Sequence, residues 1–265
     1  MSGIERIAEA FESARANGRR AALMPYLMAG FPDLDRSREI ACAYVEGGAD
    51  LIELGVPFSD PLADGPVIHA AGVAALAAGA NAADALSVAR EVADEVPVIV
   101  MCYANLVLAR GLERFTEMLV AVGASGLIVP DLPLEEAPAT LAALDARGLA
   151  LVPLVAPTTP ESRLAQIGAR ARGFLYTVSV TGTTGERAGT DLSLADVLAR
   201  ARAHTDTPVA VGFGIGTPDQ AAAAADAGAD GVIVGSRLVR AAGESHESVD
   251  AVRSLVADFA LALAA

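Results

Sequence analysis

Gly48-Ala49-Asp50-Leu51-Ile52-Glu53-Leu54-Gly55 is the stretch that decides the fold. A glycine ends a helix, a tight turn follows, and a short apolar run with the length of a buried strand begins at once. The same kind of turn precedes two later apolar runs, at Gly123-Ala124-Ser125-Gly126 and Gly228-Ala229-Asp230-Gly231. This recurrence indicates a series of βα units around a parallel sheet.

The rest of the chain follows this alternation of short β-branched runs and alanine-rich helical segments. We predict eight strands, at Leu23–Met28, Leu51–Leu54, Val98–Cys102, Gly126–Val129, Ala150–Val155, Phe174–Val178, Val209–Val211 and Val232–Val234. We predict helices between them at Ser37–Glu46, Ala82–Val92, Leu112–Val122, Glu135–Ala146, Glu161–Ala169, Leu194–Ala203 and Asp219–Ala227. Two more, at residues 4–16 and 247–264, lead and close the chain.

The expected fold is α/β, a (β/α)₈ TIM barrel with an extra N-terminal helix, and residues 1–265 form one domain. An open doubly wound sheet is the alternative. It needs fewer strands than the sequence offers, and no G-x-G-x-x-G motif follows the first strand.

Composition excludes several classes of function. The formal net charge is −14, which disfavours binding to nucleic acid or to an anionic membrane. The first residues lack the pattern of a signal peptide, and no apolar run is long enough to span a bilayer. Cys42 and Cys102 form no disulfide framework and no zinc ligand set. We therefore expect a cytoplasmic protein.

The chain contains no lysine, since all 19 basic residues are arginine. Schiff-base catalysis by a lysine is therefore excluded. His69, His204 and His246 are far apart and match no metal-ligand spacing, so no metal site is expected.

Glu53 is an ionisable residue in an otherwise apolar strand. Burial of its carboxylate is costly unless its pKa rises or a cation pairs with it, and the nearby Asp60 and Asp64 are acids too. Crowded carboxyls in an apolar pocket suit general acid/base catalysis. Glu53 has the parity of Leu51, which places both inside the barrel, with Ile52 and Leu54 toward the helices. The alternative is a core glutamate bound by a distant arginine.

Proline residues stiffen the loop after this strand. Pro57, Pro61 and Pro66 restrict its backbone and would hold Asp60 and Asp64 in defined positions.

Glycines follow the last two predicted strands, where barrel enzymes commonly bind phosphate. They occur in Gly212-Phe213-Gly214-Ile215-Gly216 and in Val234-Gly235-Ser236, after which a short helix begins. Backbone N–H groups and a helix N-terminus can hold an anion there. Residues 179–193, rich in Gly, Thr and Ser, could donate to the phosphate and close over the mouth as a lid.

Four motifs together resemble a known family. The run from Glu53 to Pro66, with Met101-Cys102-Tyr103-Ala104-Asn105, Val129-Pro130-Asp131-Leu132-Pro133 and Gly212-Phe213-Gly214-Ile215, resembles the α chain of tryptophan synthase over nearly the whole chain. The resemblance implies a carbon–carbon lyase that cleaves indole-3-glycerol phosphate to indole and glyceraldehyde 3-phosphate. It also implies an α₂β₂ complex in which pyridoxal phosphate belongs to the β chain and this chain needs no cofactor.

The resemblance also implies roles for single residues. Glu53 is the proton carrier, Asp64 its partner, and Tyr176 either acts beside the acid or only packs there. The implied indole pocket comprises Tyr26, Met101, Tyr103, Pro130 and Val155. The implied phosphate binders are Thr184, Gly185, Gly214, Gly235 and Ser236. Pro57, Phe58 and Asp60 would face the β chain, unless Phe58 folds back over the barrel. Val180 stands where the family often has an arginine, so the lid departs from the family pattern.

The implied reaction needs neither lysine nor metal. Protonation of indole carbon C3 makes the ring itself the electron sink of a retro-aldol cleavage, and Asp64 can stabilise the ring N–H. Three alternatives stay open: a barrel enzyme that releases indole without a partner, an isomerase of another phosphorylated sugar amine, and a scaffold that activates a β partner. The isomerases use an aspartate pair on strands one and five, and strand one here has no aspartate.

Overall fold

The computed structural model describes residues 1–178, 193–212, 214–244 and 248–264. Its strands are β1 (Ala22–Met28), β2 (Ile52–Gly55), β3 (Val98–Met101), β4 (Gly126–Ile128), β5 (Ala150–Leu151), β6 (Leu154–Val155), β7 (Leu175–Val178), β8 (Val209–Gly212) and β9 (Gly231–Val234). Its helices are α1 (Gly3–Ala16), α2 (Leu34–Glu46), α3 (Pro66–Ala77), α4 (Ala82–Val92), α5 (Ala104–Arg110), α6 (Leu112–Ala121), α7 (Pro138–Asp145), α8 (Glu161–Gly168), α9 (Leu194–Arg202), α10 (Pro218–Asp226), α11 (Ser236–Glu244) and α12 (Ser248–Ala262).

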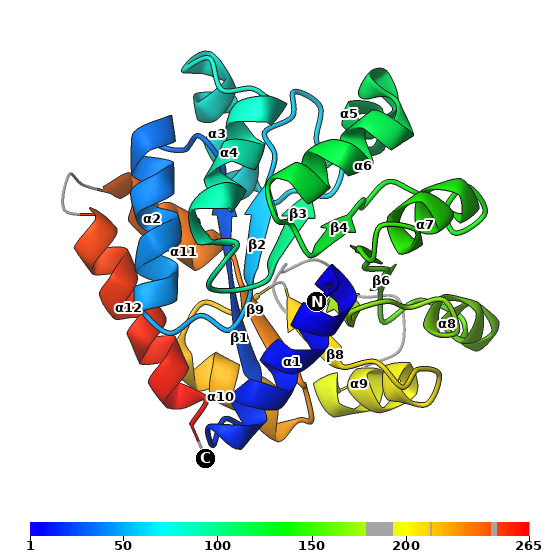
Figure 1. Ribbon diagram of the computed structural model, residues 1–265. Coiled ribbons are helices and arrows are strands. Elements are labelled where there is room, and N and C mark those ends of the chain that lie inside the picture. The colour runs from blue at the N-terminus through cyan, green and yellow to red at the C-terminus, as the bar shows by residue number, and fades with distance from the viewer. Residues whose placement is uncertain (179–192, 213, 245–247, 265) are drawn as a thin grey trace.

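The strands form a parallel sheet in the order β5-β4-β3-β2-β1-β9-β8-β7-β6, and helices surround it (Figure 1). The sheet closes through the two residues between β5 and β6. Val152 N–H donates to the Leu127 carbonyl at 2.9 Å, and the Pro153 carbonyl accepts from Tyr176 N–H at 3.0 Å. The predicted barrel is confirmed. The prediction of one continuous strand at Ala150–Val155 is wrong. β5 and β6 are separate, because Pro153 between them has no N–H to donate to a neighbouring strand.

Side chains alternate between the barrel interior and the surrounding helices, as the parity of β2 predicts. Leu51 belongs to the interior cluster with Ile99, Ile128, Ala210 and Ile233. Ile52 and Leu54 belong to the larger cluster between the sheet and the helices. The strands are therefore buried on both faces, which is why they are nearly continuous apolar runs.

Helix α1 fills one end of the barrel and lies across it in Figure 1. Ile7, Phe11 and Ala14 pack into the interior cluster, and the rings of Phe11 and Phe174 lie 5.9 Å apart. Because this apolar plug occupies the end where the strands begin, the opposite end, where they finish, is left for a site.

Two helices were missed from sequence, α3 and α5. Helix α3 is apolar except for His69 and has no amphipathic stripe, so periodicity gives no signal for it. Pro66, assigned to a loop, occupies its first turn, where a missing N–H costs nothing. Helix α7 begins at Pro138, three residues after the predicted start at Glu135, because a proline is also tolerated in its first turn.

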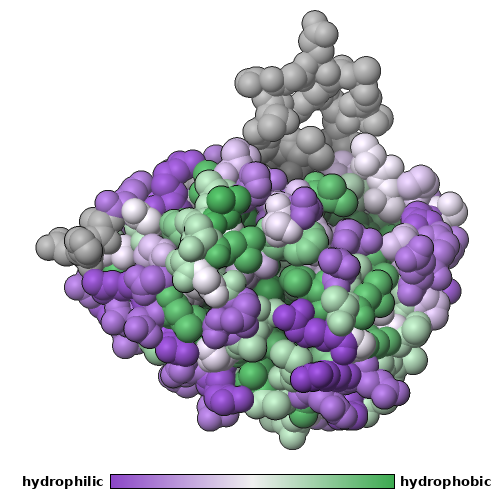
Figure 2. All heavy atoms as spheres, turned by 90° about the horizontal axis from the view of Figure 1, so that it is seen from above, coloured by the Kyte–Doolittle hydropathy of each residue, from purple (hydrophilic) through white to green (hydrophobic). Residues whose placement is uncertain are grey.

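No single helix in the described ranges is long and apolar enough to cross a membrane, although α3 and α4, bent by 109° at the break between them, pass that test as a pair. Figure 2 shows hydrophilic residues over much of one side, with hydrophobic residues grouped between them. The described part of the chain also contains no group of three or more His, Cys, Asp or Glu residues that could hold a metal ion.

Phe11→Ala should destabilise the protein by about 3–5 kcal/mol, because it empties a fully buried site at the base of the barrel. Urea unfolding followed by circular dichroism measures the loss. The exposed Glu12→Ala on the same helix is the control and should change the free energy of unfolding by less than about 0.5 kcal/mol. Equal stability of the two variants would contradict the role of α1 as a plug.

Candidate active site

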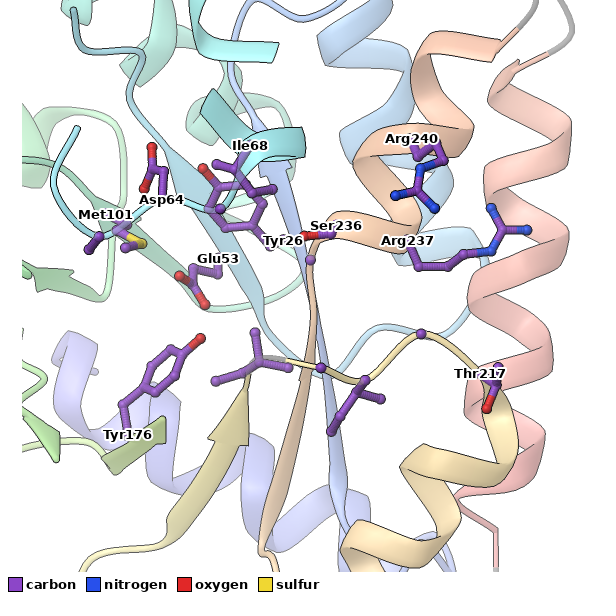
Figure 3. Close-up of a pocket in the computed structure, with 17 residues that line it drawn as sticks. Tyr26, Glu53, Asp64, Ile68, Met101, Tyr176, Thr217, Ser236, Arg237 and Arg240 are labelled. Atoms are coloured by element: carbon purple, nitrogen blue, oxygen red, sulfur yellow. The ribbon is translucent and has the colours of Figure 1, made fainter. Parts of the chain in front are cut away.

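A cavity of about 420 Å³ opens at the carboxyl end of the barrel. Figure 3 shows carboxyl and phenol groups at one end of it and two arginines at the other. The first end is lined by Tyr26, Glu53, Asp64, Met101 and Tyr176, and the second by Gly214, Thr217, Gly235, Ser236, Arg237 and Arg240. The structure thus brings together residues of β1, β2, β3, β7 and of the segments that follow β8 and β9.

Glu53 lies on β2, paired in register with Tyr26 of β1 and Ile99 of β3. It is only 4% exposed, and its carboxyl faces the cavity. Burial, and secondly the charge of Asp64, raises the pKa of Glu53 to about 8. The side chain is therefore predominantly protonated at neutral pH, in agreement with the expectation from sequence.

Tyr26 and Tyr176 reach across the barrel over glycines at the ends of β2 and β8. A Cβ atom on Gly55 would overlap the hydroxyl of Tyr26, and one on Gly212 would overlap that of Tyr176. These two strand ends must therefore lack a side chain for the tyrosines to fit. Burial raises the pKa of both phenols well above the usual value, so both are neutral. Figure 3 shows the Tyr176 hydroxyl directed toward Glu53.

Asp64 is held by Tyr103, which follows β3. The Tyr103 hydroxyl donates to Asp64 Oδ1 at 3.0 Å and accepts from Ala63 N–H at 3.0 Å. The ring of Tyr103 stacks on Phe58, with centroids 5.0 Å apart. Burial raises the pKa of Asp64, while the hydrogen bond from Tyr103 and the charge of His69 lower it. Tyr103 thus fastens both the start and the end of the loop after β2.

Several residues assigned from sequence lie elsewhere. Val155 belongs to the helix-facing cluster, and its neighbour Leu154 packs in the interior, because side chains alternate along the strand. The assignment of Val155 to the indole pocket is therefore wrong. Pro130 lines a second cavity of about 380 Å³, bounded by the ends of β4 to β6 and by α8. Tyr103 contacts Asp64 but is not among the residues that line the main cavity.

Other assignments concern the loops. Thr184, Gly185 and Val180 lie outside the described residues. Pro57 is buried, and Phe58 is half-buried against Tyr103, so Phe58 folds back over the barrel. Asp60 is exposed.

Sequence reasoning missed Ile68, Ile233, Arg237 and Arg240, which also line the main cavity. Ile233 and Gly235 are two positions apart and so have the same parity. The assignment of Gly235 to the site could therefore have identified Ile233 as a lining residue. Arg237 and Arg240 are the first two cations after the Gly235-Ser236 motif and are one helical turn apart, which was a usable signal.

Comparison with known proteins identifies the family of this chain. The family model described as tryptophan synthase alpha chain matches residues 11–262. The chain belongs to this family. The tryptophan synthase alpha chain of Synechococcus elongatus is 46% identical over 235 residues, which are 88% of each chain. That of Rippkaea orientalis is 44% identical over 261 residues, 97% of each.

Solved structures of tryptophan synthase have the same fold. One from Mycobacterium tuberculosis has a TM-score of 0.89 at 41% identity and covers 98% of both chains. One of the α₂β₂ complex from Pyrococcus furiosus has a TM-score of 0.81 at 34% identity, covering 90% of this chain and 97% of that chain. Membership in the tryptophan synthase alpha chain family confirms the predicted resemblance, the barrel and the class of enzyme, a carbon–carbon lyase.

Tyr103→Phe should raise the pKa of Asp64, because it removes the hydrogen bond that lowers it. Carboxyl-carbon NMR titration measures this shift. Tyr44→Phe is the matched control: it removes a buried hydroxyl that donates to the Tyr26 carbonyl at 2.9 Å instead of to Asp64. An unchanged Asp64 titration in Tyr103→Phe would show that Tyr103 does not hold this carboxyl in solution.

Proposed function

We propose that this chain cleaves indole-3-glycerol phosphate to indole and glyceraldehyde 3-phosphate, with Glu53 as the general acid. The observation that carries this proposal is the Glu53 carboxyl, whose pKa burial raises to about 8, at one end of a cavity whose other end has the features of an anion site. A substrate with an aromatic ring at one end and a phosphate at the other matches these two ends.

Glu53 begins the reaction by giving its proton to C3 of the indole ring. The ring becomes an indolenine cation, and Asp64 stabilises it by accepting a hydrogen bond from the ring N–H. The bond between C3 and the glycerol chain then breaks as the neighbouring chain hydroxyl loses its proton. The bonding electrons return to the ring, which restores the aromatic indole, and the hydroxyl carbon becomes the aldehyde. The Glu53 carboxylate formed in the first step is the base that we assign to this proton.

The aromatic end of the cavity supports the ring. Tyr26, Met101, Ile68 and Ile233 provide apolar surface beside Glu53. The Tyr176 hydroxyl, directed toward Glu53, donates to its carboxylate after proton transfer and so lowers the cost of the buried charge.

The opposite end binds the phosphate. Gly235 precedes α11 and lines the cavity with Ser236, the first residue of that helix, and with Gly214, whose φ is +85°. A left-handed glycine and a helix N-terminus together present backbone donors to an anion. Thr184 and Gly185 complete this site in the proposal, by their match to the family motif.

The partner is the tryptophan synthase β chain, in an α₂β₂ complex whose pyridoxal phosphate belongs to β. Large apolar side chains are exposed next to the site: Leu62 is 84% exposed and Leu108 is 68% exposed. Leu62 adjoins Ala63, which Tyr103 binds, and Leu108 lies on the helix that follows Tyr103. We assign Leu62 and Leu108, with the exposed Asp60, to the surface that contacts the β chain, because exposed large apolar side chains with charges at the rim are typical of an interface.

We assign residues 1–265 to one domain. The C-terminal end of the described chain returns to the segment between α1 and β1, because Arg20 N–H donates to the Leu263 carbonyl at 2.8 Å and Arg19 pairs with Ala264 in a β-bridge. The proposed location is the cytoplasm, which the two unpaired cysteines, Cys42 and Cys102, support.

Glu53→Gln should lower kcat for indole release by about 10²–10⁴-fold, because the amide cannot donate the proton. Indole release from indole-3-glycerol phosphate is followed with and without the β chain. Asp64→Asn should also be strongly impaired, and the exposed Glu9→Gln on α1 should keep wild-type turnover. Near wild-type turnover in Glu53→Gln would refute the role of Glu53 as the general acid. A wild-type protein that releases no indole but activates the β chain would instead be a scaffold for that chain.

The Glu53→Gln variant also tests how the Glu53 carboxyl affects the free energy of unfolding. In wild type the unfolded chain releases the Glu53 proton near pH 4.5 and the folded chain near pH 8, so ionisation lowers the free energy of unfolding across this interval. Glu53→Gln lacks this loss and should be more stable than wild type above pH 8. Urea unfolding at several pH values measures the difference, and an equal pH dependence would show that the carboxyl is not buried.

The pH profile of kcat/KM should fall on its alkaline side with an apparent pKa near 8, because Glu53 must be protonated to act. Asp64 raises this pKa, so the residual activity of Asp64→Asn should lose its alkaline limb at lower pH than wild type. A limb that stays in place in Asp64→Asn would assign the titration to another group.

A further inference from the structure

Two arginines of α11 face the phosphate end of the cavity. Arg237 and Arg240 line it together with Ser236 and Thr217 (Figure 3). They are three residues apart and so share one side of the helix. Arg237 is half-buried and Arg240 is exposed, so both guanidinium groups keep access to a ligand that enters from solvent.

The described residues provide no carboxylate partner for either guanidinium, although arginines are commonly paired on this protein. Arg200 pairs with Glu161 at 2.6 Å and Arg202 with Asp230 at 2.9 Å. No such ion pair is formed by Arg237 or Arg240 within the described ranges, in a chain whose acidic residues outnumber its basic ones by 33 to 19. Two neighbouring cations without a carboxylate partner in the described part of so acidic a protein indicate a site that receives its anion from outside.

We propose that Arg237 and Arg240 bind the phosphate group of the substrate and provide the positive charge that selects it. This inference rests on the proposed function and deepens it. A cradle of neutral N–H groups and one hydroxyl holds an anion by dipoles alone, and the net charge of −14 opposes the approach of a phosphate dianion. The two guanidinium groups reverse the sign of the field at this end of the cavity.

The separation of acidic and basic groups along the cavity determines which substrate the site prefers and how that substrate is oriented. The acids Glu53 and Asp64 lie at the end that receives the indole ring, and the cations lie at the end that receives the phosphate. A reversed substrate would bring its phosphate beside two carboxyl groups, which is unfavourable. The arginines therefore favour phosphorylated over unphosphorylated indole-glycerol and set its orientation.

The direct test is binding of inorganic phosphate to the full chain, measured by isothermal titration calorimetry at low ionic strength. Arg237→Gln and Arg240→Gln should each weaken binding about 3–10-fold, and the double variant more, because each removes a charge-assisted contact. Arg90→Gln is the matched control: Arg90 is an exposed arginine of α4, outside the lining of this cavity, and its loss removes the same charge. It should bind phosphate as wild type does, apart from a small salt-sensitive change. Arg237→Lys should retain much of the affinity, since the charge stays.

Kinetics with indole-3-glycerol phosphate separate this inference from the proposed reaction. The glutamine variants should raise KM several-fold and leave kcat within about twofold, because the contact is made equally in the ground and transition states. Phosphate affinity that falls no further in Arg237→Gln and Arg240→Gln than in Arg90→Gln overturns the inference, whatever the wild type catalyses. A wild type that cleaves no substrate, with phosphate affinity still dependent on both arginines, refutes the reaction and leaves this phosphate site standing.

Discussion

The proposed function depends on the burial of one carboxyl group inside a closed parallel barrel. Glu53 is on a strand that is paired on both sides, so its position is fixed by the sheet and not by its own side chain. Removal from water raises its pKa to about 8, and Asp64 adds to the effect. The fold thereby keeps a proton on a side chain that water would ionise, at a cost in stability, and such a protonated carboxyl at neutral pH is what the proposed general acid requires.

The surroundings of Glu53 are arranged to tolerate this burial and to use it. Two strand ends are glycine, Gly55 and Gly212, which leaves room for the hydroxyl groups of Tyr26 and Tyr176. Tyr103 fixes the loop that bears Asp64 through two hydrogen bonds and a ring stack. The cavity then changes from carboxyl groups at one end to arginines at the other, which is the distribution of groups that the proposed substrate, an aromatic ring joined to a phosphate, requires.

The parts of the fold that could be predicted from sequence are those with a local physical signature. Alternating β-branched and helical runs predicted a barrel, and parity predicted that Leu51 would be inside and Ile52 outside. Helix α3 has no polar face and was missed, and Pro153 divides the fifth strand. Val155 was assigned to the pocket by the family match alone. Side chains alternate along the strand, and this alternation directs Val155 toward the helices and Leu154 into the barrel.

The sequence by itself determined the parallel barrel, the acid in its second strand and the exclusion of lysine chemistry, because each follows from residue type and local spacing. Only the tertiary structure decided which side chains meet. The contact of Tyr103 with Asp64 joins residues 39 positions apart, and the return of Phe58 onto Tyr103 depends on how two loops pack. The orientation of Arg237 and Arg240 toward the cavity depends likewise on where α11 docks. Such contacts are set by the closure of the whole barrel, and no short stretch of sequence contains that information.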